Sequence, residues 1–192
     1  MRRALALLAG PVLMAGLCHG ALAQVLGEVS PRVSDLVGGI FCAPAEGERR
    51  PAPDTIAGWV HIPASPIEMV AIGNEAPMVL GLGFGVRFVL EGGPASQVRY
   101  TVTHPPIPPG NQTAQSWDSV LVGGAQDSAF FQFDTPEEMQ PGLWGFAVEA
   151  DGEVLFTMQF TVRPAADLPV LAALCRGGAL LSFSPETRAA AG

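Results

Sequence analysis

Residues 142–162, GLWGFAVEADGEVLFTMQFTV, contain two alternating runs on either side of one Asp-Gly pair. Trp144 and Phe146 alternate with small or polar residues before the pair, and apolar residues keep the same period of two after it. Successive side chains of a strand point to opposite faces, so each run predicts a β-strand with one apolar face. Asp151 and Gly152 tolerate the positive φ values of a two-residue turn. The segment therefore predicts an antiparallel hairpin whose apolar face needs a partner.

Short runs with a period of two recur through the chain, separated by Gly, Pro and Asp. Before the hairpin, strands are expected at residues 36–41, 58–62, 67–71, 85–90, 97–103, 116–122 and 129–133. Many short strands without a convincing long amphipathic helix before Ala165 are typical of a sandwich or barrel. Because the large residues fall on one face of each strand, we expect an all-β antiparallel β-sandwich of about eight strands.

Segments rich in Arg, Pro or Gly interrupt these strands. GERRPAPDT, residues 47–55, is expected to be a loop. The strand at residues 97–103 is expected to end at His104, because two prolines follow and proline donates no hydrogen bond to a sheet. GLGFG, residues 81–85, superficially suggests a phosphate-binding loop, but such loops open a helix and here a strand follows. We expect a Gly-rich strand entrance at which aromatic neighbours pack or a bulge forms.

The N-terminal residues have the pattern of a secretion signal. Arg2 and Arg3 precede an apolar run, and Ala21-Leu22-Ala23 matches a signal-peptidase site. An uncleaved anchor is the alternative, and no later segment is long and apolar enough to span a bilayer. The expected organisation is a signal peptide at residues 1–23, a β-sandwich at residues 24–164, a short helical or irregular strap packed on it at residues 165–184, and a disordered tail at residues 185–192.

Two cysteines remain after cleavage, Cys42 near the start of the domain and Cys175 near its end. An even count in an oxidising compartment predicts a disulfide. It would close a loop of about 130 residues and contribute on the order of 5 kcal/mol at most. Free buried thiols or a metal pair are the alternatives, and metal is disfavoured because no second Cys or His lies at ligand spacing. We predict a Cys42–Cys175 disulfide and a periplasmic or secreted location.

The charge of the chain bears on its partners. The formal net charge is -8, and the sequence contains no Lys. Such an acidic surface repels phosphate backbones, and the Arg residues are scattered, so nucleic acid is disfavoured as a partner. The abundance of Ala, Gly, Pro and Arg fits a GC-rich bacterial coding sequence.

Several separate segments together carry a family resemblance. The run GLGFGVRFVL, the THPP segment, Ser116-Trp117, the FDTPEE stretch and the closing strand resemble the bacterial family named domain of unknown function 3859. The resemblance covers roughly residues 35–162, and the closing strands also resemble those of bacterial immunoglobulin-like domains. The family resemblance implies an exported, immunoglobulin-like β-sandwich. It brings no established catalytic residue, so no site residue is carried over.

Three residues around the proline-rich loop are candidates for binding. His104 ends a strand beside two prolines, and Trp117 and Asp118 follow the loop. Loops of sandwiches often carry binding residues, and an exposed Trp stacks on sugar or peptide ligands. His104, Trp117 and Asp118 are therefore hypothesised to line a surface for a small ligand or glycan, with a structural cap at His104 as the alternative. Among the tryptophans, Trp144 is expected in the core.

The residues lack the patterns that catalysis and metal binding require. Ser116, His104 and Asp118 form a nominal hydrolase trio, but Ser116 and Asp118 share one face of a strand, and no strained elbow exposes the hydroxyl. Glu137-Glu138 is an adjacent pair in a turn and does not flank a substrate. No Asp-rich loop suits calcium. We expect no catalytic residue, no metal and no cofactor.

These observations give three hypotheses for function. The leading one is a non-enzymatic, exported binding or interaction module whose loops or edge strand meet a protein partner in the bacterial cell envelope. The second is a small-ligand or glycan binder that uses the loop from His104 to Trp117. The third is a hydrolase.

Overall fold

Strands make up most of the chain that the structure describes. The computed structural model describes residues 27–44 and 47–175. Within them the strands are β1 (Val33–Cys42), β2 (Gly47–Pro51), β3 (Trp59–Pro63), β4 (Ala71–Ile72), β5 (Glu75–Met78), β6 (Leu82–Leu90), β7 (Ser96–Ile107), β8 (Gln112–Leu121), β9 (Gln126–Gln132), β10 (Gly142–Ala150) and β11 (Glu153–Pro164). The helical elements are short: the 3₁₀ helices η1 (Pro136–Glu138) and η2 (Ala165–Asp167), and the helix α1 (Pro169–Ala172).

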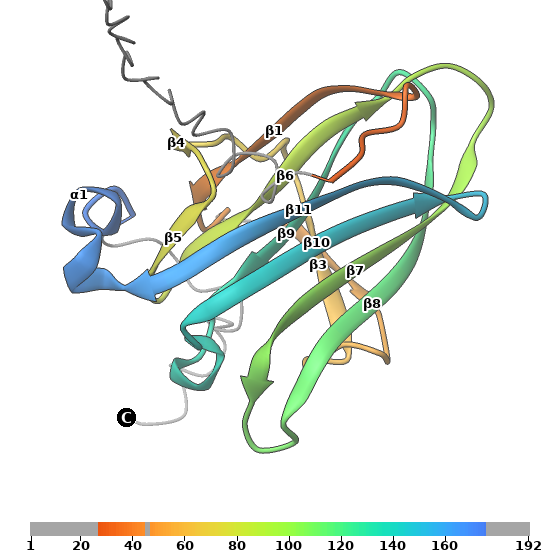
Figure 1. The fold of residues 1–192 in the computed structure, drawn as a ribbon. Helices are drawn as coiled ribbons and strands as arrows, with labels where there is room; N and C mark the ends of the chain where they lie inside the picture. The colour runs from red at the N-terminus through yellow and green to blue at the C-terminus, as the bar shows by residue number, and fades with distance from the viewer. Residues whose placement is uncertain (1–26, 45–46, 176–192) are drawn as a thin grey trace, which may run out of the picture.

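Two large sheets pack face to face (Figure 1). One sheet has the strand order β4-β1-β6-β9, and the other has the order β5-β11-β10-β7-β8. Neighbouring strands are antiparallel except β5 and β11, which are parallel. The chain crosses between the two large sheets after β4, β5, β6, β8 and β9, as in the Greek-key connections of immunoglobulin-like sandwiches. The expected all-β, immunoglobulin-like sandwich is confirmed.

The closing hairpin forms as its alternation predicts. Asp151 and Gly152 have φ values of 54° and 84°, which a tight turn between right-handed twisted strands requires. The pairing shifts by one residue after Val148, where a bulge leaves both Leu155 and Phe156 fully buried. The hairpin thereby buries more apolar area than strict alternation allows, and it supplies the central strands of the larger sheet.

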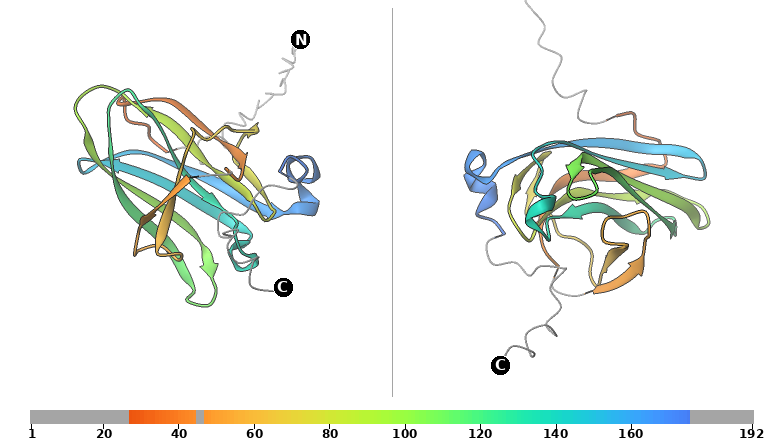
Figure 2. Two further views of the ribbon diagram at one scale, coloured as in Figure 1. Left: turned by 180° about the vertical axis from the view of Figure 1, so that it is seen from behind. Right: turned by 90° about the horizontal axis from the view of Figure 1, so that it is seen from below.

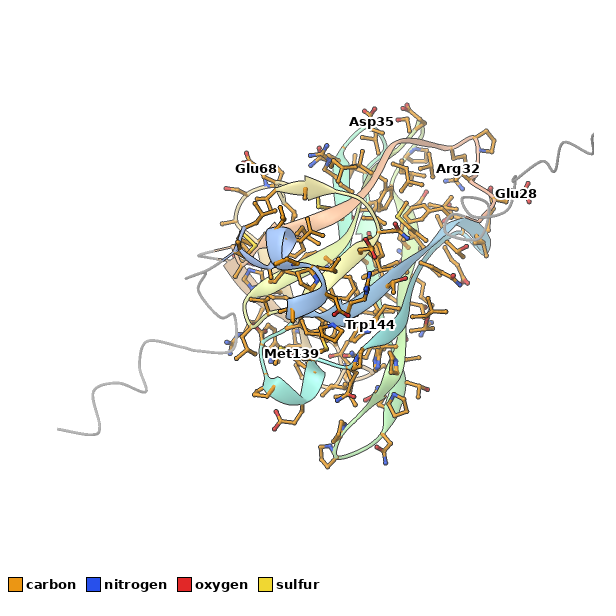
Figure 3. The ribbon with its side chains drawn as sticks, turned by 60° about the vertical axis from the view of Figure 1, so that its left-hand side comes forward. Glu28, Arg32, Asp35, Glu68, Met139 and Trp144 are labelled. Carbon is orange, nitrogen blue, oxygen red and sulfur yellow. A yellow bond between two sulfur atoms is a disulfide. The ribbon has the colours of Figure 1, made fainter. Side chains whose placement is uncertain are left out.

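An aromatic cluster fills the space between the sheets. The ring centroid of Phe84 on β6 lies 5.3 Å from that of Trp144 and 5.5 Å from that of Phe160 on the facing sheet. Trp144, labelled in Figure 3, is fully buried, and its indole N–H donates to the carbonyl of Gln140 at 3.0 Å, so its polar group is satisfied. The expectation that Trp144 belongs to the core is confirmed.

The Gly-rich run begins at Gly81, just before β6, and continues into the strand, where Gly83 makes room for an aromatic ring. A Cβ atom at Gly83 would lie 2.1 Å from the ring of Phe41, which crosses β6 from the neighbouring strand. The ring of Phe41 packs edge-on against Phe130 with centroids 5.2 Å apart. This run is therefore a strand in which glycine admits an aromatic neighbour, as the sequence analysis expects, and a phosphate loop is excluded by its extended backbone.

Two predictions for the first half of the chain are wrong. GERRP, expected to be part of a loop, is β2 and pairs with β3 from Gly47 opposite Pro63 to Pro51 opposite Trp59. Proline is tolerated because Pro51 ends the strand. The strand expected at residues 67–71 is β4, which begins only at Ala71, and the parallel edge strand β5 was not expected at all.

The third correction concerns the prolines after His104. Strand β7 continues through Pro105 and Pro106 to Ile107 instead of ending at His104. The pairing with β8 is interrupted between Thr103 and Ile107, so neither proline has to donate a ladder hydrogen bond. The long β7–β8 ribbon extends beyond the rest of the sheet for this reason (Figure 1).

The disulfide between Cys42 and Cys175 is confirmed, with Cα atoms 5.1 Å apart. It joins the end of β1 to the residues that follow α1, and within α1 Leu171 packs on the core and Ala172 is buried. The predicted signal peptide at residues 1–23 and tail at residues 185–192 lie outside the described residues, as does the part of the predicted strap after Cys175. None of the helices in the described ranges has the length and apolar character needed to cross a bilayer.

Candidate functional site

One side of the sandwich is open and is covered by a separate hairpin. Strands β8 and β9 each end their own sheet, so two sheet edges meet there. Residues 47–70, which connect β1 to β4 and contain the β2–β3 hairpin, lie over this side, and we call them the arm. Figure 2 shows the hairpin, in orange, standing outside the two sheets. The arm thus covers the open side of the sandwich and leaves a partly enclosed space beneath it.

Backbone and side-chain hydrogen bonds fasten the tip of the arm to β8. The amide of Ile56 donates to the side-chain oxygen Oε1 of Gln115 at 2.9 Å. The amide of Ser116 donates to the carbonyl of Asp54 at 3.4 Å. Further along β8, Arg50 donates to the hydroxyl of Ser119 at 3.1 Å. These contacts place the arm over the inward-facing residues of β8.

A cavity of about 420 Å³ lies between the arm and the edges of the two sheets. Part of its wall is aromatic, with Trp59 from the arm, Tyr100 and Trp117 from the larger sheet, and Phe130 from β9. The rest carries hydroxyl, amide, guanidinium and carboxyl groups. Ligand sites of small molecules have volumes of about 300–1,000 Å³ and combine apolar walls with a few placed polar groups, so the cavity has the size and composition of such a site.

The aromatic wall on the larger sheet is a stacked pair. Tyr100 and Trp117 face each other across β7 and β8 with ring centroids 5.3 Å apart and planes 11° from parallel. The hydroxyl of Tyr100 donates to the carboxylate of Asp127 on β9, which bridges the two sheet edges. Burial, followed by the negative charge of Asp127, raises the pKa of Tyr100 well above its usual value. Tyr100 therefore stays protonated and holds the Trp117 ring in place.

His104 lies directly behind the cavity wall rather than in it. The side chain is only 5% exposed, and its Nδ1 lies 2.9 Å from the carbonyl oxygen of Pro105. Because that carbonyl accepts only, Nδ1 carries the proton, and Nε2 accepts from Gln115 Nε2 at 3.1 Å. Burial lowers the pKa of His104, so the neutral imidazole is favoured. Hydrogen bonds thus connect His104 in the core, through the side chain of Gln115, to the backbone of Ile56 in the arm.

Asp118 lies on the opposite face of β8 from Trp117. Its carboxylate lies 3.6 Å from the guanidinium of Arg99, and the same Arg99 donates to the hydroxyl of Ser116 at 3.3 Å. Of the three predicted binding residues, the structure therefore brings Trp117 to the cavity, places His104 behind it, and leaves Asp118 on the outer face. The nominal hydrolase trio is not assembled, because Ser116 and Asp118 face away from His104.

Glu138 and Asp134 add acidic, partly buried groups to the cavity lining. Glu138 accepts hydrogen bonds from the amides of Asp134 at 2.7 Å and Thr135 at 3.0 Å, and burial raises its pKa. Gln132 donates through Nε2 to the carboxylate of Asp134 at 2.7 Å. The Gln132 side chain is buried, and its Oε1 accepts no hydrogen bond within the described part of the chain. A buried acceptor without a donor is costly, so Gln132 is a candidate for contact with a ligand.

Sequence reasoning missed most of the cavity. Gln115, Trp117 and Ser119 alternate on β8, so they share the inward face of a strand where apolar residues are usual. That polar and aromatic face is a signal that the sequence does contain. Trp59 lies in the strand expected at residues 58–62, but no sequence signal places this strand over the edges of the two sheets. Among the described residues, no group of three or more His, Cys, Asp or Glu side chains is arranged to hold a metal ion.

Comparison with known proteins gives a family and several solved structures. The family described as "Domain of unknown function (DUF3859)" matches residues 29–162. No curated protein shows significant similarity. A crystal structure of an immunoglobulin-like protein from Pseudomonas aeruginosa is 23% identical, with 68% of this chain and 96% of that chain covered and a TM-score of 0.45.

Two further solved structures share less of their length with this chain. An alkylpurine DNA glycosylase from Pseudomonas fluorescens, bound to DNA with an abasic-site analogue, is 19% identical, with 47% of this chain and 28% of that chain covered and a TM-score of 0.30. A β-D-glucoside glucohydrolase from Trichoderma reesei is 15% identical, with 69% and 18% covered and a TM-score of 0.28.

Proposed function

The chain belongs to the family described as domain of unknown function DUF3859, and from that premise we propose that it is a non-enzymatic binding module of the bacterial cell envelope. Its ligand site is the cavity between the arm and the edge strands β8 and β9. The observation that supports this most strongly is the combination in one cavity of about 420 Å³ of two tryptophans and buried polar groups. Both the size and this mixture are those of a small-molecule site.

Binding accounts for the polar groups of the cavity better than catalysis does. Tyr100 stays protonated and donates a hydrogen bond to Asp127, while Glu138 accepts hydrogen bonds from two backbone amides. His104, the most suitable general base in the predicted trio, is buried and engaged at both ring nitrogens. Groups that hold each other in fixed hydrogen bonds orient a ligand, whereas proton transfer requires a group within reach of the substrate.

Export to the envelope is supported by the disulfide and by the N-terminal pattern. The Cys42–Cys175 disulfide requires an oxidising compartment in most bacteria, and residues 1–23 have the pattern of a signal peptide. The mass of the mature protein recovered from the periplasm tests both points. The proposal predicts a chain that begins near Gln24 and gains two hydrogen masses on reduction.

A protein partner is the second candidate. Val120 and Val122 are 53% and 63% exposed at the end of β8, which is an edge strand of the larger sheet. Exposed apolar residues on a sheet edge suit the addition of a strand from another chain. If this is the function, substituting Val120→Glu would abolish the complex, whereas filling the cavity would leave it intact.

The cavity proposal is tested by filling the cavity. Ser128 lines it on β9, whereas Ser116 lies on the outer face of β8. A library of small polar metabolites is screened by ligand-observed NMR against the wild type, Ser128→Trp and Ser116→Trp. We expect compounds that bind the wild type and Ser116→Trp and lose binding to Ser128→Trp. Absence of any binder, or binders that tolerate Ser128→Trp, would contradict the proposal.

A further inference from the structure

The cavity has walls that suit the two kinds of surface a sugar ring presents. Trp59 and Trp117 lie on the arm and on β8, and Phe130 contributes a further ring from β9. The C–H face of a sugar packs on an aromatic ring, while its hydroxyl groups need partners around the edge. Aromatic residues with polar neighbours provide both, since the ring supplies apolar area and the neighbours supply direction.

Hydrogen-bond acceptors gather along β9 and the residues that follow it. Asp127, Gln132 and Asp134 all line the cavity, and the Gln132 side chain is only 6% exposed. Its Oε1 has no donor among the described residues, while its Nε2 is held by Asp134. The bond to Asp134 fixes which end of the amide is the acceptor, because a carboxylate only accepts. A donor from the ligand would relieve this buried acceptor.

Hydrogen-bond donors lie on the facing strand and on the arm. Arg50 gives one bond to the hydroxyl of Ser119, and a guanidinium has five N–H groups in all. The hydroxyl of Ser119 lines the same space, and Ser128 adds a further hydroxyl from β9. A ligand therefore meets donors and acceptors together. Hydroxyl groups, which donate and accept at once, match such a site better than purely apolar groups or purely donating groups do.

The charges around the cavity select against anions. Three carboxyl groups, of Asp127, Asp134 and Glu138, line it together with one guanidinium, that of Arg50, and the whole chain is acidic with a net charge of -8. A phosphate or a sugar acid would be repelled. Each carboxyl group already accepts a hydrogen bond from an uncharged donor, namely the Tyr100 hydroxyl, the Gln132 amide or backbone amides. A carboxylate can accept more than one hydrogen bond, so each of these groups can also accept from an uncharged donor on a ligand.

We propose that the cavity binds a small, uncharged carbohydrate, with a ring packed against the tryptophans and a hydroxyl donated to Gln132 Oε1. This inference rests on the proposed function, because it assumes that the cavity is the binding site. The arm covers the bound sugar, and the acceptors on β9 set the orientation of its hydroxyls.

The ligand class is tested with matched probes and the full mature protein. Tryptophan fluorescence and calorimetry follow titrations with methyl β-D-glucoside, cellobiose, N-acetylglucosamine, glucuronic acid, glucosamine and cyclohexylmethanol. We expect at least one neutral sugar to bind, with glucuronic acid weaker by about tenfold or more. Tighter binding of glucosamine or cyclohexylmethanol than of every neutral sugar overturns the carbohydrate assignment but leaves the cavity as the binding site. If none of the six probes binds, but other compounds bind the cavity by NMR, the carbohydrate assignment is also overturned and the cavity remains the binding site.

Variants of Gln132 and Trp59 identify the contacts. Gln132→Met keeps the side-chain length and removes the buried acceptor, so we expect sugar binding to weaken roughly tenfold, the loss of about one buried hydrogen bond. The matched control is Gln159→Met, on the exposed outer face of β11, which we expect to bind as the wild type does. Trp59→Leu, in the exterior arm, should weaken binding without unfolding the sandwich. Unchanged sugar affinity in both Gln132→Met and Trp59→Leu would overturn the proposal.

Discussion

The β10–β11 hairpin and the β2–β3 hairpin have the same topology, but they are built from different surfaces. In β10–β11, Trp144, Phe146 and Phe160 are at most 1% exposed and face the other sheet. In the arm, β2 carries Glu48, Arg49 and Arg50, and half-buried Trp59 lies beneath the guanidinium of Arg49 at 4.1 Å. The first hairpin is held by packed rings, and the second is positioned by hydrogen bonds with β8.

This difference separates stability from binding. Apolar burial of about 1.5–3 kcal/mol per large side chain makes the closing hairpin a main contributor to the free energy of folding. The buried residues of the arm, Ala52, Thr55 and Ile67, lie outside the main hydrophobic cluster of the described residues. The arm therefore covers the cavity without being part of the core. Substitutions in the arm should affect ligand binding more than the free energy of unfolding.

The largest expected effect comes from the core side of this comparison. Trp144→Ala removes a fully buried ring that packs against Phe84 and His104, so it should lower the free energy of unfolding by about 3–5 kcal/mol. Trp59→Ala in the arm should lower it by about 1 kcal/mol, since that ring is only half-buried. Urea unfolding of both variants measures the difference. Equal losses would show that the arm is part of the same cooperative core.

Removing the disulfide is expected to have the next largest effect. The Cys42–Cys175 bond closes a loop of 133 residues, and its loss should cost about 2–5 kcal/mol. A Cys42→Ser, Cys175→Ser double variant compared with the oxidised protein gives this value by denaturant unfolding. We expect ligand binding at a temperature below the transition to be retained, because neither cysteine lines the cavity. A binding defect in the folded double variant would show that the disulfide contributes to binding as well as to stability, which contradicts this expectation.

Loosening the arm gives a smaller, local effect. Gln115→Leu removes the acceptor of the Ile56 amide and the donor to His104. Each lost bond costs about 1 kcal/mol, and a buried group left unpaired raises this to about 1–3 kcal/mol. Amide hydrogen exchange should accelerate at Ile56 while the amides of β10 and β11 keep their protection. Uniform acceleration over the whole chain would instead mean global destabilisation.

The smallest expected effect is a pH dependence of the hydrogen bonds that Gln115 makes with His104 and Ile56. Burial lowers the pKa of His104, so the folded state binds fewer protons than the unfolded state, and stability falls as pH drops below about 6.5 towards the folded pKa. Protonated Nε2 becomes a donor facing the Gln115 amide nitrogen, and the amide must turn its Oε1 away from Ile56 to pair with it. NMR titration should show His104 with a lowered pKa and Ile56 exchanging faster in acid. A His104 pKa that is not lowered would refute this coupling. Amide exchange at Ile56 that does not change as His104 titrates would refute it as well.

The sequence was informative where one face of a strand is buried against the core. The closing hairpin, the turn at Asp151-Gly152, the core position of Trp144 and the disulfide partners were all predictable, because period-two burial and paired cysteines leave a direct trace. In the arm, β3 was predicted as a strand but β2 was not, because β2 pairs with β3 on the exterior and its Arg-rich sequence has no apolar alternation.

The cavity was predictable only in part. Trp117 was identified, whereas Gln115 and Ser119, two residues away on either side along the same strand face, were passed over because no loop or motif marks them. Asp118 was chosen for its nearness in sequence, but alternation along β8 turns it to the outer face beside Arg99. Gln132 and Asp127 come from a strand of the other sheet, and only the packing of the two edges brings them to Trp117.

The central claim, that the arm-covered cavity is the binding site, is tested most directly by mapping amide chemical-shift changes on titration with a neutral sugar that binds. If the sugar binds there, the shifts are confined to the arm, the inward residues of β8, and the segment from Asp127 to Glu138. Shifts concentrated on the outer face of β7 and β10, with the arm and β9 unchanged, would contradict it.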